Sequence, residues 1–193
     1  MKAPLVLAST SPQRRAILEQ LGLPFEVVAP RYDERGEGAL EPVELVCAHA
    51  EGKARSVAGQ AGGRPVLGVD TAIVLDDLVL GKPESEGEAA EMLEQLGGRT
   101  HAVVSGLCLI SPGWEVVEHA ETSVSLRALT SRDVAWYVAS GEWRGRAGAY
   151  AIQGLGAVLV ERIEGDYLNV VGLPGALLVR LLATRFAGAY GFG

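Results

Sequence analysis

Two adjacent arginines stand at the start of a predicted helix, where helix electrostatics disfavour them. The apolar run Leu5–Ala8 predicts a buried strand, and Ser11 followed by Pro12 is typical of a helix N-terminus. The first turn then carries Arg14 and Arg15. Because this end of a helix has a positive partial charge, a cation there costs a few tenths to about 1 kcal/mol. A bound anion would remove the conflict.

A phosphate group fits the chemistry of this segment. Backbone N–H groups, the hydroxyls of Ser9 and Ser11, and the guanidinium groups of Arg14 and Arg15 would converge on phosphate oxygens. The alternative is an ordinary helix cap followed by two solvated arginines, with Arg15 paired to Glu19 four residues later. The residues alone leave both interpretations open.

A second candidate site combines a carboxylate on a strand with a lysine after a hairpin. Asp70 interrupts an apolar strand predicted over residues 66–75, and buried aspartates are rare unless they are paired or bound to metal. A two-residue turn and a returning strand then lead to Lys82. Asp70 and Lys82 are therefore expected to face one cleft, either as catalytic groups or as a structural ion pair. Pro83 follows Lys82, so the segment is not a P-loop.

Four further residues are weaker candidates. Asp33 and Glu34 would join Asp70 as hard oxygen ligands for Mg²⁺ or Mn²⁺, unless they are solvated loop acids. Lys53 lies on a predicted helix, where a lone lysine is usually exposed. Gln153, in a Gly-rich stretch, carries an amide that either reads a base edge or belongs to a turn. Motifs of zinc peptidases, serine hydrolases and nicotinamide enzymes are absent from the sequence.

Composition and charge exclude several classes of protein. The 193 residues are 48% hydrophobic and 21% charged, which is ordinary for one globular domain. A net charge of −7 argues against non-specific nucleic-acid binding. Cys47 and Cys108 lie in neither a CxxC nor a Cys/His cluster, and although the two could form a disulfide, buried free thiols are expected. Neither a signal peptide nor a membrane span is recognisable, so a cytoplasmic location is expected.

The order of predicted elements gives the fold class. Helices and strands alternate, but hairpins intrude, which predicts an α/β fold with a mixed sheet. The predicted strands cover 5–8, 25–29, 66–75, 78–80, 101–110, 115–129 and 158–163. The predicted helices begin at or after residues 12, 42, 86, 131 and 174, with a polar loop over 31–40.

Taken together in order, the motifs resemble the Maf family of nucleoside triphosphate pyrophosphatases. The resemblance spans nearly the whole chain, and it is the ordered set that is specific. Its carriers are residues 7–15 (LASTSPQRR), 33–34 (DE), 53–54 (KA), 68–71 (GVDT), 81–83 (GKP), 147–154 (AGAYAIQG), 165–167 (GDY) and 171–174 (VGLP).

The resemblance implies a fold and an activity. The fold would be one domain over residues 1–193, an elongated mixed sheet flanked by helices, with two lobes around a central cleft, similar to inosine triphosphate pyrophosphatases. The reaction would cleave a nucleoside triphosphate into a monophosphate and pyrophosphate with a divalent cation, Mg²⁺ or Mn²⁺. The family is often homodimeric and is linked to clearing non-standard nucleotides and to arrest of septation.

The resemblance also implies roles for single residues. Asp70 matches the proposed proton acceptor, and Glu34 matches an acidic loop residue expected to bind metal with it. Thr71 and Gln153 resemble the branch acting on dTTP and UTP. That branch usually has arginine at the position of Gln13, whereas the branch acting on 7-methyl-GTP has an aromatic residue there. The phosphate-binding positions would be Ser9, Ser11, Arg14, Arg15, Lys53 and Lys82.

A non-enzymatic function is the second hypothesis. A nucleotide sensor that controls septation through a protein partner would share the phosphate-binding residues but would not need Asp70. Turnover of a nucleotide therefore separates the two hypotheses.

Overall fold

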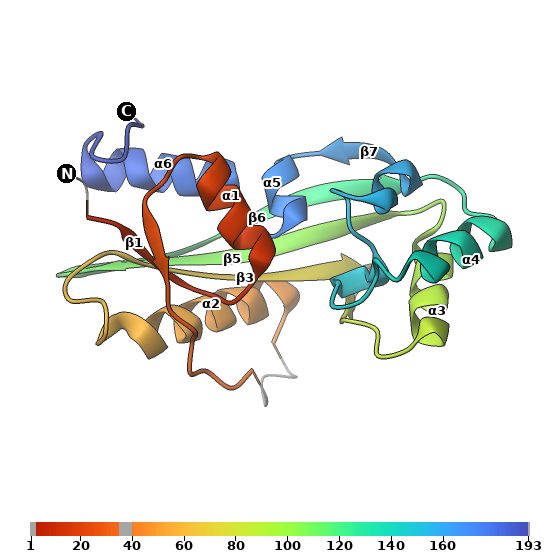
Figure 1. The fold of residues 1–193 in the computed structure, drawn as a ribbon, viewed down its shortest axis with the longest axis horizontal. Coiled ribbons are helices and arrows are strands. Elements are labelled where there is room, and N and C mark those ends of the chain that lie inside the picture. The colour runs from red at the N-terminus through yellow and green to blue at the C-terminus, as the bar shows by residue number, and fades with distance from the viewer. Residues whose placement is uncertain (1–2, 35–39, 193) are drawn as a thin grey trace. The chain divides into compact units, whose positions relative to one another are not determined.

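The fold is built on one mixed β-sheet (Figure 1). The computed structural model describes residues 3–34 and 40–192. The seven-stranded sheet has the order β2-β1-β3-β5-β6-β7, and β4 pairs with β3. Strand β1 is parallel to both β2 and β3, whereas β4 is antiparallel to β3 and β7 is antiparallel to β6. The strands are β1 (Leu5–Ala8), β2 (Phe25–Val27), β3 (Val66–Leu75), β4 (Leu78–Leu80), β5 (Thr100–Ser111), β6 (Trp114–Leu126) and β7 (Val160–Glu164).

The helices confirm most of the expected pattern. Pro12 and Pro42 begin helices as predicted, and Thr130 caps α4 through a capping box with Asp133. Two short 3₁₀ helices and α5 were not predicted, and η2 takes the first two residues of the strand expected over 158–163. Of the loop expected over 31–40, residues 35–39 lie outside the described residues. The helices are α1 (Pro12–Gln20), α2 (Pro42–Ala58), α3 (Glu86–Leu96), α4 (Ser131–Ser140), η1 (Ala147–Ala149), η2 (Leu155–Leu159), α5 (Tyr167–Val171) and α6 (Gly175–Phe186).

The chain divides into two compact units. The first unit comprises Met1–Thr71, Ser105–Ala120 and Gly172–Gly193, and the second comprises Ala72–Val104 and Glu121–Val171. The α/β class with a mixed sheet and flanking helices is confirmed. The single domain over residues 1–193 with a cleft between two lobes stays a prediction.

In the first unit, α2 lies on one face of the sheet while α1 and α6 lie on the other (Figure 1). Helix α2 approaches β3 and β5 closely because glycines stand at the contact points. A Cβ on Gly68 would overlap the carbonyl of Ala50, and one on Gly106 would overlap the carbonyl of Val46. This close approach brings the polar side of α2 near the residues that follow Gly68 on β3.

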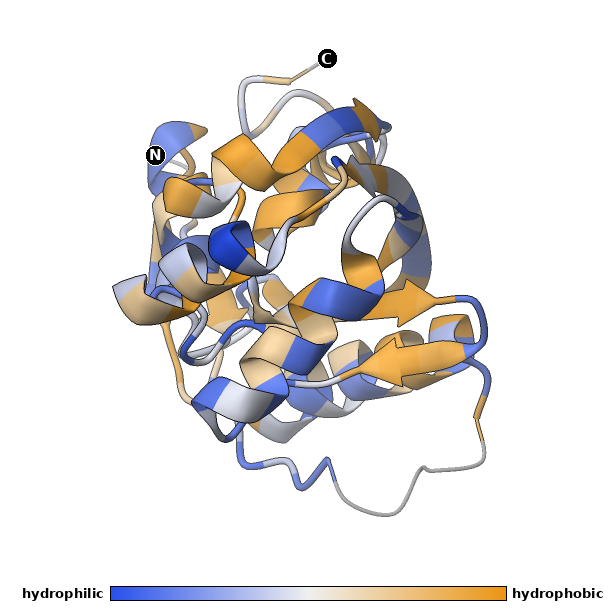
Figure 2. Ribbon diagram, turned by 90° about the vertical axis from the view of Figure 1, so that its right-hand side faces the viewer, coloured by the Kyte–Doolittle hydropathy of each residue, from blue (hydrophilic) through white to orange (hydrophobic). Residues whose placement is uncertain are grey.

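The second unit has its own hydrophobic core. Helices α3 and α4 contribute buried residues to one cluster with β3, β5 and β6. Figure 2 shows that these helices carry both hydrophobic and hydrophilic residues, as amphipathic elements do. The cluster includes Ile73, Leu93, Val103, Leu126 and Tyr137.

The predicted lack of a membrane-spanning helix and the predicted state of the two cysteines can be compared with the structure. Over residues 3–34 and 40–192, no helix has both the length and the hydropathy that a membrane crossing needs. Cys47 and Cys108 are free thiols as predicted, and Cys108 is buried, but Cys47 is only partly buried.

Candidate active site

The turn between β1 and α1 is held by two serines. Ser11 is extended and caps α1, since its hydroxyl accepts a hydrogen bond from the backbone N–H of Arg14 at 3.4 Å. Its own N–H donates to the hydroxyl of Ser9 at 3.1 Å, and its hydroxyl donates to Oε1 of Gln13 at 3.0 Å. Ser9 is buried. The backbone of this turn is therefore fixed by its own side chains.

Arg14 joins three separate segments of the first unit. Its Nε donates to the carbonyl oxygen of Gly172 at 2.9 Å, Nη1 to Ser9 Oγ at 3.3 Å and Nη2 to Thr71 Oγ1 at 3.4 Å. Burial lowers the pKa of Arg14, although the charges of Asp70 and Glu34 act in the opposite direction. A guanidinium group remains charged in a protein, so Arg14 supplies a fixed, partly desolvated cation.

Gly172 adopts a backbone conformation that side chains disfavour. Its φ is +128°, and in this conformation its carbonyl oxygen accepts hydrogen bonds from Arg14 and from the Thr71 hydroxyl. Thr71 also shares a hydrogen bond of 2.8 Å with the hydroxyl of Ser105, which is fully buried. Neither Gly172 nor Ser105 was assigned a role from the sequence. A polar residue within the apolar strand predicted over 101–110 was the available signal for Ser105.

Arg15 lies apart from this network. Its side chain is 62% exposed, and its Nε pairs with Glu19 Oε1 at 2.9 Å. This is the i,i+4 pair that the sequence offered as the alternative to phosphate binding. The role of Arg15 in phosphate binding stays a prediction.

A lysine bridges the two candidate metal ligands. Lys53 Nζ lies 2.6 Å from Asp70 Oδ1 and 2.7 Å from Glu34 Oε1. The Lys53 side chain is 9% exposed and that of Asp70 16% exposed, whereas the Glu34 side chain is 56% exposed. The structure thus brings Lys53, Glu34 and Asp70 together, and Asp33 is exposed beside them in sequence.

The loop that carries Glu34 is anchored on α2 by Tyr32. Its hydroxyl is 3.3 Å from His49 Nδ1, and the two rings pack edge to face. The Tyr32 ring occupies the space that a Cβ on Gly52 would need. Gly52 directly precedes Lys53, so the same turn of α2 holds the loop and presents the ammonium group. Sequence reasoning missed both Tyr32 and Gly52.

The remaining predicted residues lie in the second unit. Lys82 is exposed after β4, and Gln153 is exposed between η1 and η2. The two segments are tied together, because the N–H of Gly148 donates to the carbonyl of Gly81 at 3.0 Å. Their participation in one site with Asp70 stays a prediction.

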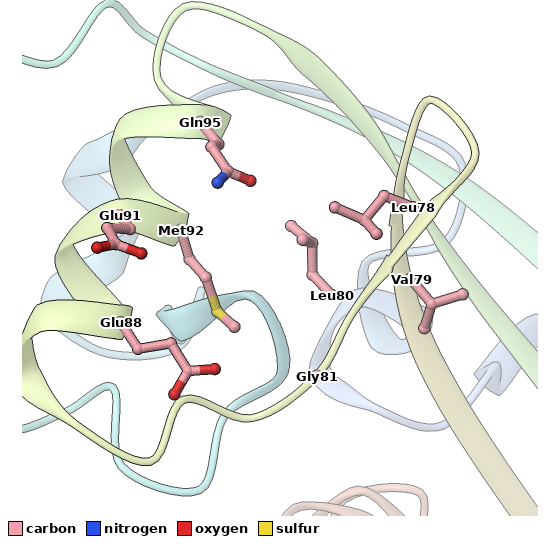
Figure 3. Close-up of a pocket in the computed structure, with 8 residues that line it drawn as sticks. All are labelled: Leu78, Val79, Leu80, Gly81, Glu88, Glu91, Met92 and Gln95. Carbon is pink, nitrogen blue, oxygen red and sulfur yellow. The ribbon is translucent and has the colours of Figure 1, made fainter.

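A pocket of about 320 Å³ lies between β4 and α3 in the second unit (Figure 3). Leu78 and Leu80 extend from β4 toward α3, whose facing residues include Met92 (Figure 3). Its charged lining residues are Glu88 and Glu91. Two carboxylates beside apolar side chains oppose the binding of a triphosphate, so this pocket is not the candidate active site.

Comparison with known proteins identifies the family. Residues 4–185 match the Maf-like protein family. The chain belongs to the Maf family. This assignment confirms the resemblance drawn from the ordered motifs, and all the predicted site residues lie within the matched range.

Three curated relatives of this Maf chain are each named dTTP/UTP pyrophosphatase. A dTTP/UTP pyrophosphatase of Nitratidesulfovibrio vulgaris is 49% identical over 187 residues, covering 95% of this chain and 89% of the relative. One from Moorella thermoacetica is 50% identical over 181 residues, covering 93% of each chain. Another, from Deinococcus radiodurans, is 44% identical over 189 residues, covering 98% of this chain and 95% of the relative.

Proposed function

We propose that this Maf-family chain is a nucleoside triphosphate pyrophosphatase that prefers dTTP and UTP. The observation that supports it best is the grouping of Arg14, Lys53, Asp70 and Glu34 within the first unit. The names of the relatives supply the substrate class. The reaction adds water across the bond between the α- and β-phosphates, giving a nucleoside monophosphate and pyrophosphate.

The cations and the β1–α1 turn would bind the triphosphate. Arg14 already donates to Ser9 and Thr71, so a phosphate oxygen at this point would meet a guanidinium group held by three acceptors. Lys82 is a further proposed phosphate-binding cation. Charge that builds up on the leaving pyrophosphate would be stabilised by these cations, and positioning and electrostatics are the main contributions of protein groups to phosphoryl transfer.

Asp70 is the proposed proton acceptor. The Lys53 ammonium donates a hydrogen bond to Asp70 Oδ1 at 2.6 Å, which holds the carboxylate in place. As the oxygen of the attacking water bonds to phosphorus, its proton passes to Asp70 and the bridging P–O bond breaks. A correctly placed general base typically contributes about a hundred- to ten-thousandfold in rate.

The donor set fits a small, hard divalent cation. Asp70 and Glu34 place one carboxylate oxygen each within 3 Å of the same ammonium nitrogen, so both can serve one cation. No cluster of three acidic, histidine or cysteine ligands occurs in the described residues. Mg²⁺ is commonly bound by one or two carboxylates together with substrate phosphates and water. When bound, the ion would neutralise phosphate charge and orient the attack.

Gln153, Thr71 and Gln13 are the residues proposed for base selection. Gln153 would read the base edge through its amide, with Thr71 and Gln13 contributing to preference. Oε1 of Gln13 accepts a hydrogen bond from the hydroxyl of Ser11. The branch of the family that acts on dTTP and UTP usually has arginine at this position. We therefore expect dTTP and UTP to lead the ranking, with a narrower margin than arginine would give.

The cell context follows from chemistry and the family. Free thiols at Cys47 and Cys108 are typical of a reducing compartment, which supports action in the cytoplasm. Clearing non-standard nucleotides and arresting septation are the proposed physiological roles, and homodimerisation is the proposed assembly.

The deciding experiment measures pyrophosphate release from a panel of triphosphates. dTTP, UTP, dCTP, CTP, GTP and ATP are incubated with the full chain, with Mg²⁺ or with a chelator. We expect pyrophosphate and monophosphate from dTTP and UTP in the presence of Mg²⁺. Release of inorganic phosphate would contradict α–β cleavage, whereas nucleotide binding without turnover would favour the sensor.

A further inference from the structure

One glutamate outside the predicted site accepts three hydrogen bonds from the second unit. Glu142 follows the left-handed cap residue Gly141 at the end of α4. Its Oε1 accepts from the N–H of Leu155 at 2.9 Å, and its Oε2 accepts from the N–H of Gly156 at 2.9 Å and from the hydroxyl of Tyr137 at 2.8 Å. Because η2 has no side-chain cap of its own, a remote carboxylate satisfies its first N–H groups.

The same network reaches the other side of Gln153. The Tyr137 hydroxyl, which donates to Glu142, accepts a hydrogen bond from the N–H of Ala151 at 3.0 Å. Tyr137 is fully buried in α4 and so provides a rigid support. Residues 151, 155 and 156 are thus tied to one Tyr137–Glu142 pair, and Gln153 lies between the tied positions.

Gly154 is required by space, because a Cβ there would overlap Glu142 Oε1. Any side chain at this position would displace the carboxylate or the loop. Burial raises the pKa of Glu142, but hydrogen bonds from Gly156, Tyr137 and Leu155 outweigh it and lower the pKa overall, so the group is charged at neutral pH.

We propose that Glu142 is a positioning residue for base selection, which fixes the backbone on both sides of Gln153 so that the Gln153 amide meets the base at one angle. The inference rests on the proposed function, because it takes Gln153 as the residue that reads the base. Glu142 itself is assigned no contact with the nucleotide. Gln153 and its neighbours 154 and 155 are exposed, so little packing restrains this segment. Charge-assisted hydrogen bonds to N–H groups are about twice as strong as neutral ones, and they supply the missing restraint.

Glu142→Gln tests the proposal with minimal change of shape. The amide NH₂ would face an N–H or O–H donor, so at least one of the three hydrogen bonds is lost. We expect the ratio of kcat/KM for dTTP to that for dCTP to fall by about tenfold, in the same direction as for Gln153→Ala. Glu164→Gln is the matched control, since Glu164 is exposed and pairs with Arg162 at 3.3 Å; its ratio should stay within about twofold.

A double-mutant cycle separates positioning from general stability. In the Gln153→Ala background, Glu142→Gln should no longer change the dTTP/dCTP ratio, because the residue that it positions is gone. Gly154→Ala, which displaces the same carboxylate from the other side, should reproduce the selectivity loss if Glu142→Gln fails to fold.

The outcomes distinguish this inference from the proposed function. If Gln153→Ala changes the ratio but Glu142→Gln and Gly154→Ala lower kcat/KM equally for all nucleotides, the positioning role is wrong and the proposed function stands. If Gln153→Ala leaves the ratio unchanged, base reading by Gln153 is wrong, and the inference fails with it. Absence of pyrophosphate release by the unaltered chain would overturn the proposed function itself.

Discussion

Lys53 Nζ lies 2.6 Å from Asp70 Oδ1, which joins α2 to β3 at the centre of the candidate site. The pair is mostly buried, and Glu34 is the second carboxylate on the same ammonium group. Such an arrangement fixes the orientation of the Asp70 carboxylate. The same lysine offsets the repulsion between these two carboxylates.

Removing the proposed proton acceptor should abolish most turnover. Asp70→Asn keeps the size of the side chain and a hydrogen-bonding oxygen for Lys53, but it cannot take the proton of the attacking water. We expect kcat for pyrophosphate release to fall at least about a hundredfold while the fold is retained. Steady-state kinetics with dTTP measure kcat, and circular dichroism shows whether the fold is retained.

Asp77→Asn is the control for that substitution. Asp77 is exposed in the turn between β3 and β4, so its loss should leave kcat unchanged. A Mg²⁺-dependent Asp70→Asn enzyme with normal kcat would exclude Asp70 from the chemistry.

Removing Lys53 should destabilise the fold and make its stability depend on Mg²⁺. Lys53→Met leaves Asp70 with an unpaired, mostly buried charge, and breaking a buried pair in this way costs about 3 kcal/mol. A divalent cation bound by Asp70 and Glu34 would restore part of the loss, since binding to the folded state alone stabilises it. Urea unfolding with and without Mg²⁺ measures the free energy of unfolding in each case.

Arg15→Met provides the contrast for Lys53→Met. Arg15 forms an exposed ion pair with Glu19, and such pairs contribute about 0 to 1 kcal/mol. Its stability should change little, and its response to Mg²⁺ should match that of the unaltered chain, because Lys53, Asp70 and Glu34 are all retained. A Mg²⁺ response of Lys53→Met no larger than that of the other two proteins would argue against a cation that replaces the lost charge at Asp70 and Glu34.

Arg14 and Arg15 are expected to differ in substrate binding. Arg14 is held by Ser9, Thr71 and Gly172, whereas the Arg15 side chain is largely solvent-exposed. Arg14→Lys loses the planar guanidinium group, which can donate two parallel hydrogen bonds to a phosphate. We expect KM for dTTP to rise at least about tenfold. Arg15→Lys should raise it by less than about threefold, because an exposed ion pair is weak. Equal increases would mean that both guanidinium groups bind phosphate.

Local sequence signals were sufficient for most of the fold. Ser11-Pro12 and Glu41-Pro42 begin helices where predicted, because caps and proline act on the backbone directly. Helix α5 was missed because five residues, Tyr167–Val171, are too few to establish a helical period. The strand predicted at 158–163 was shifted because η2 uses its first residues.

Residue types in the site were predictable, but their partners were not. The shared cleft of Asp70 and Lys82 stays a prediction, whereas the contact of Asp70 with Lys53 in the structure was not expected from the sequence. That contact depends on the close approach of α2 at Gly68, two residues before Asp70, which is a tertiary property. A glycine inside a strand is a signal for such an approach, and it was present in the sequence.

The buried histidine of the second unit should make stability depend on pH. His101 is 3% exposed, and its Nε2 lies 2.9 Å from the Tyr150 hydroxyl. Burial lowers its pKa from 6.5 to about 4, so between these values the unfolded chain binds a proton that the folded chain does not. Stability contributed by neutral His101 is therefore present above pH 6.5 and is lost as the pH falls toward 4, by about 3 kcal/mol in all. Urea unfolding at intervals from pH 4 to 7 measures how the free energy of unfolding changes with pH.

Two histidine variants test the source of this pH dependence. His101→Gln should flatten the slope of the free energy of unfolding against pH, whereas His119→Gln, at an exposed position, should leave the slope unchanged. A slope that persists in His101→Gln would assign the pH dependence to other groups.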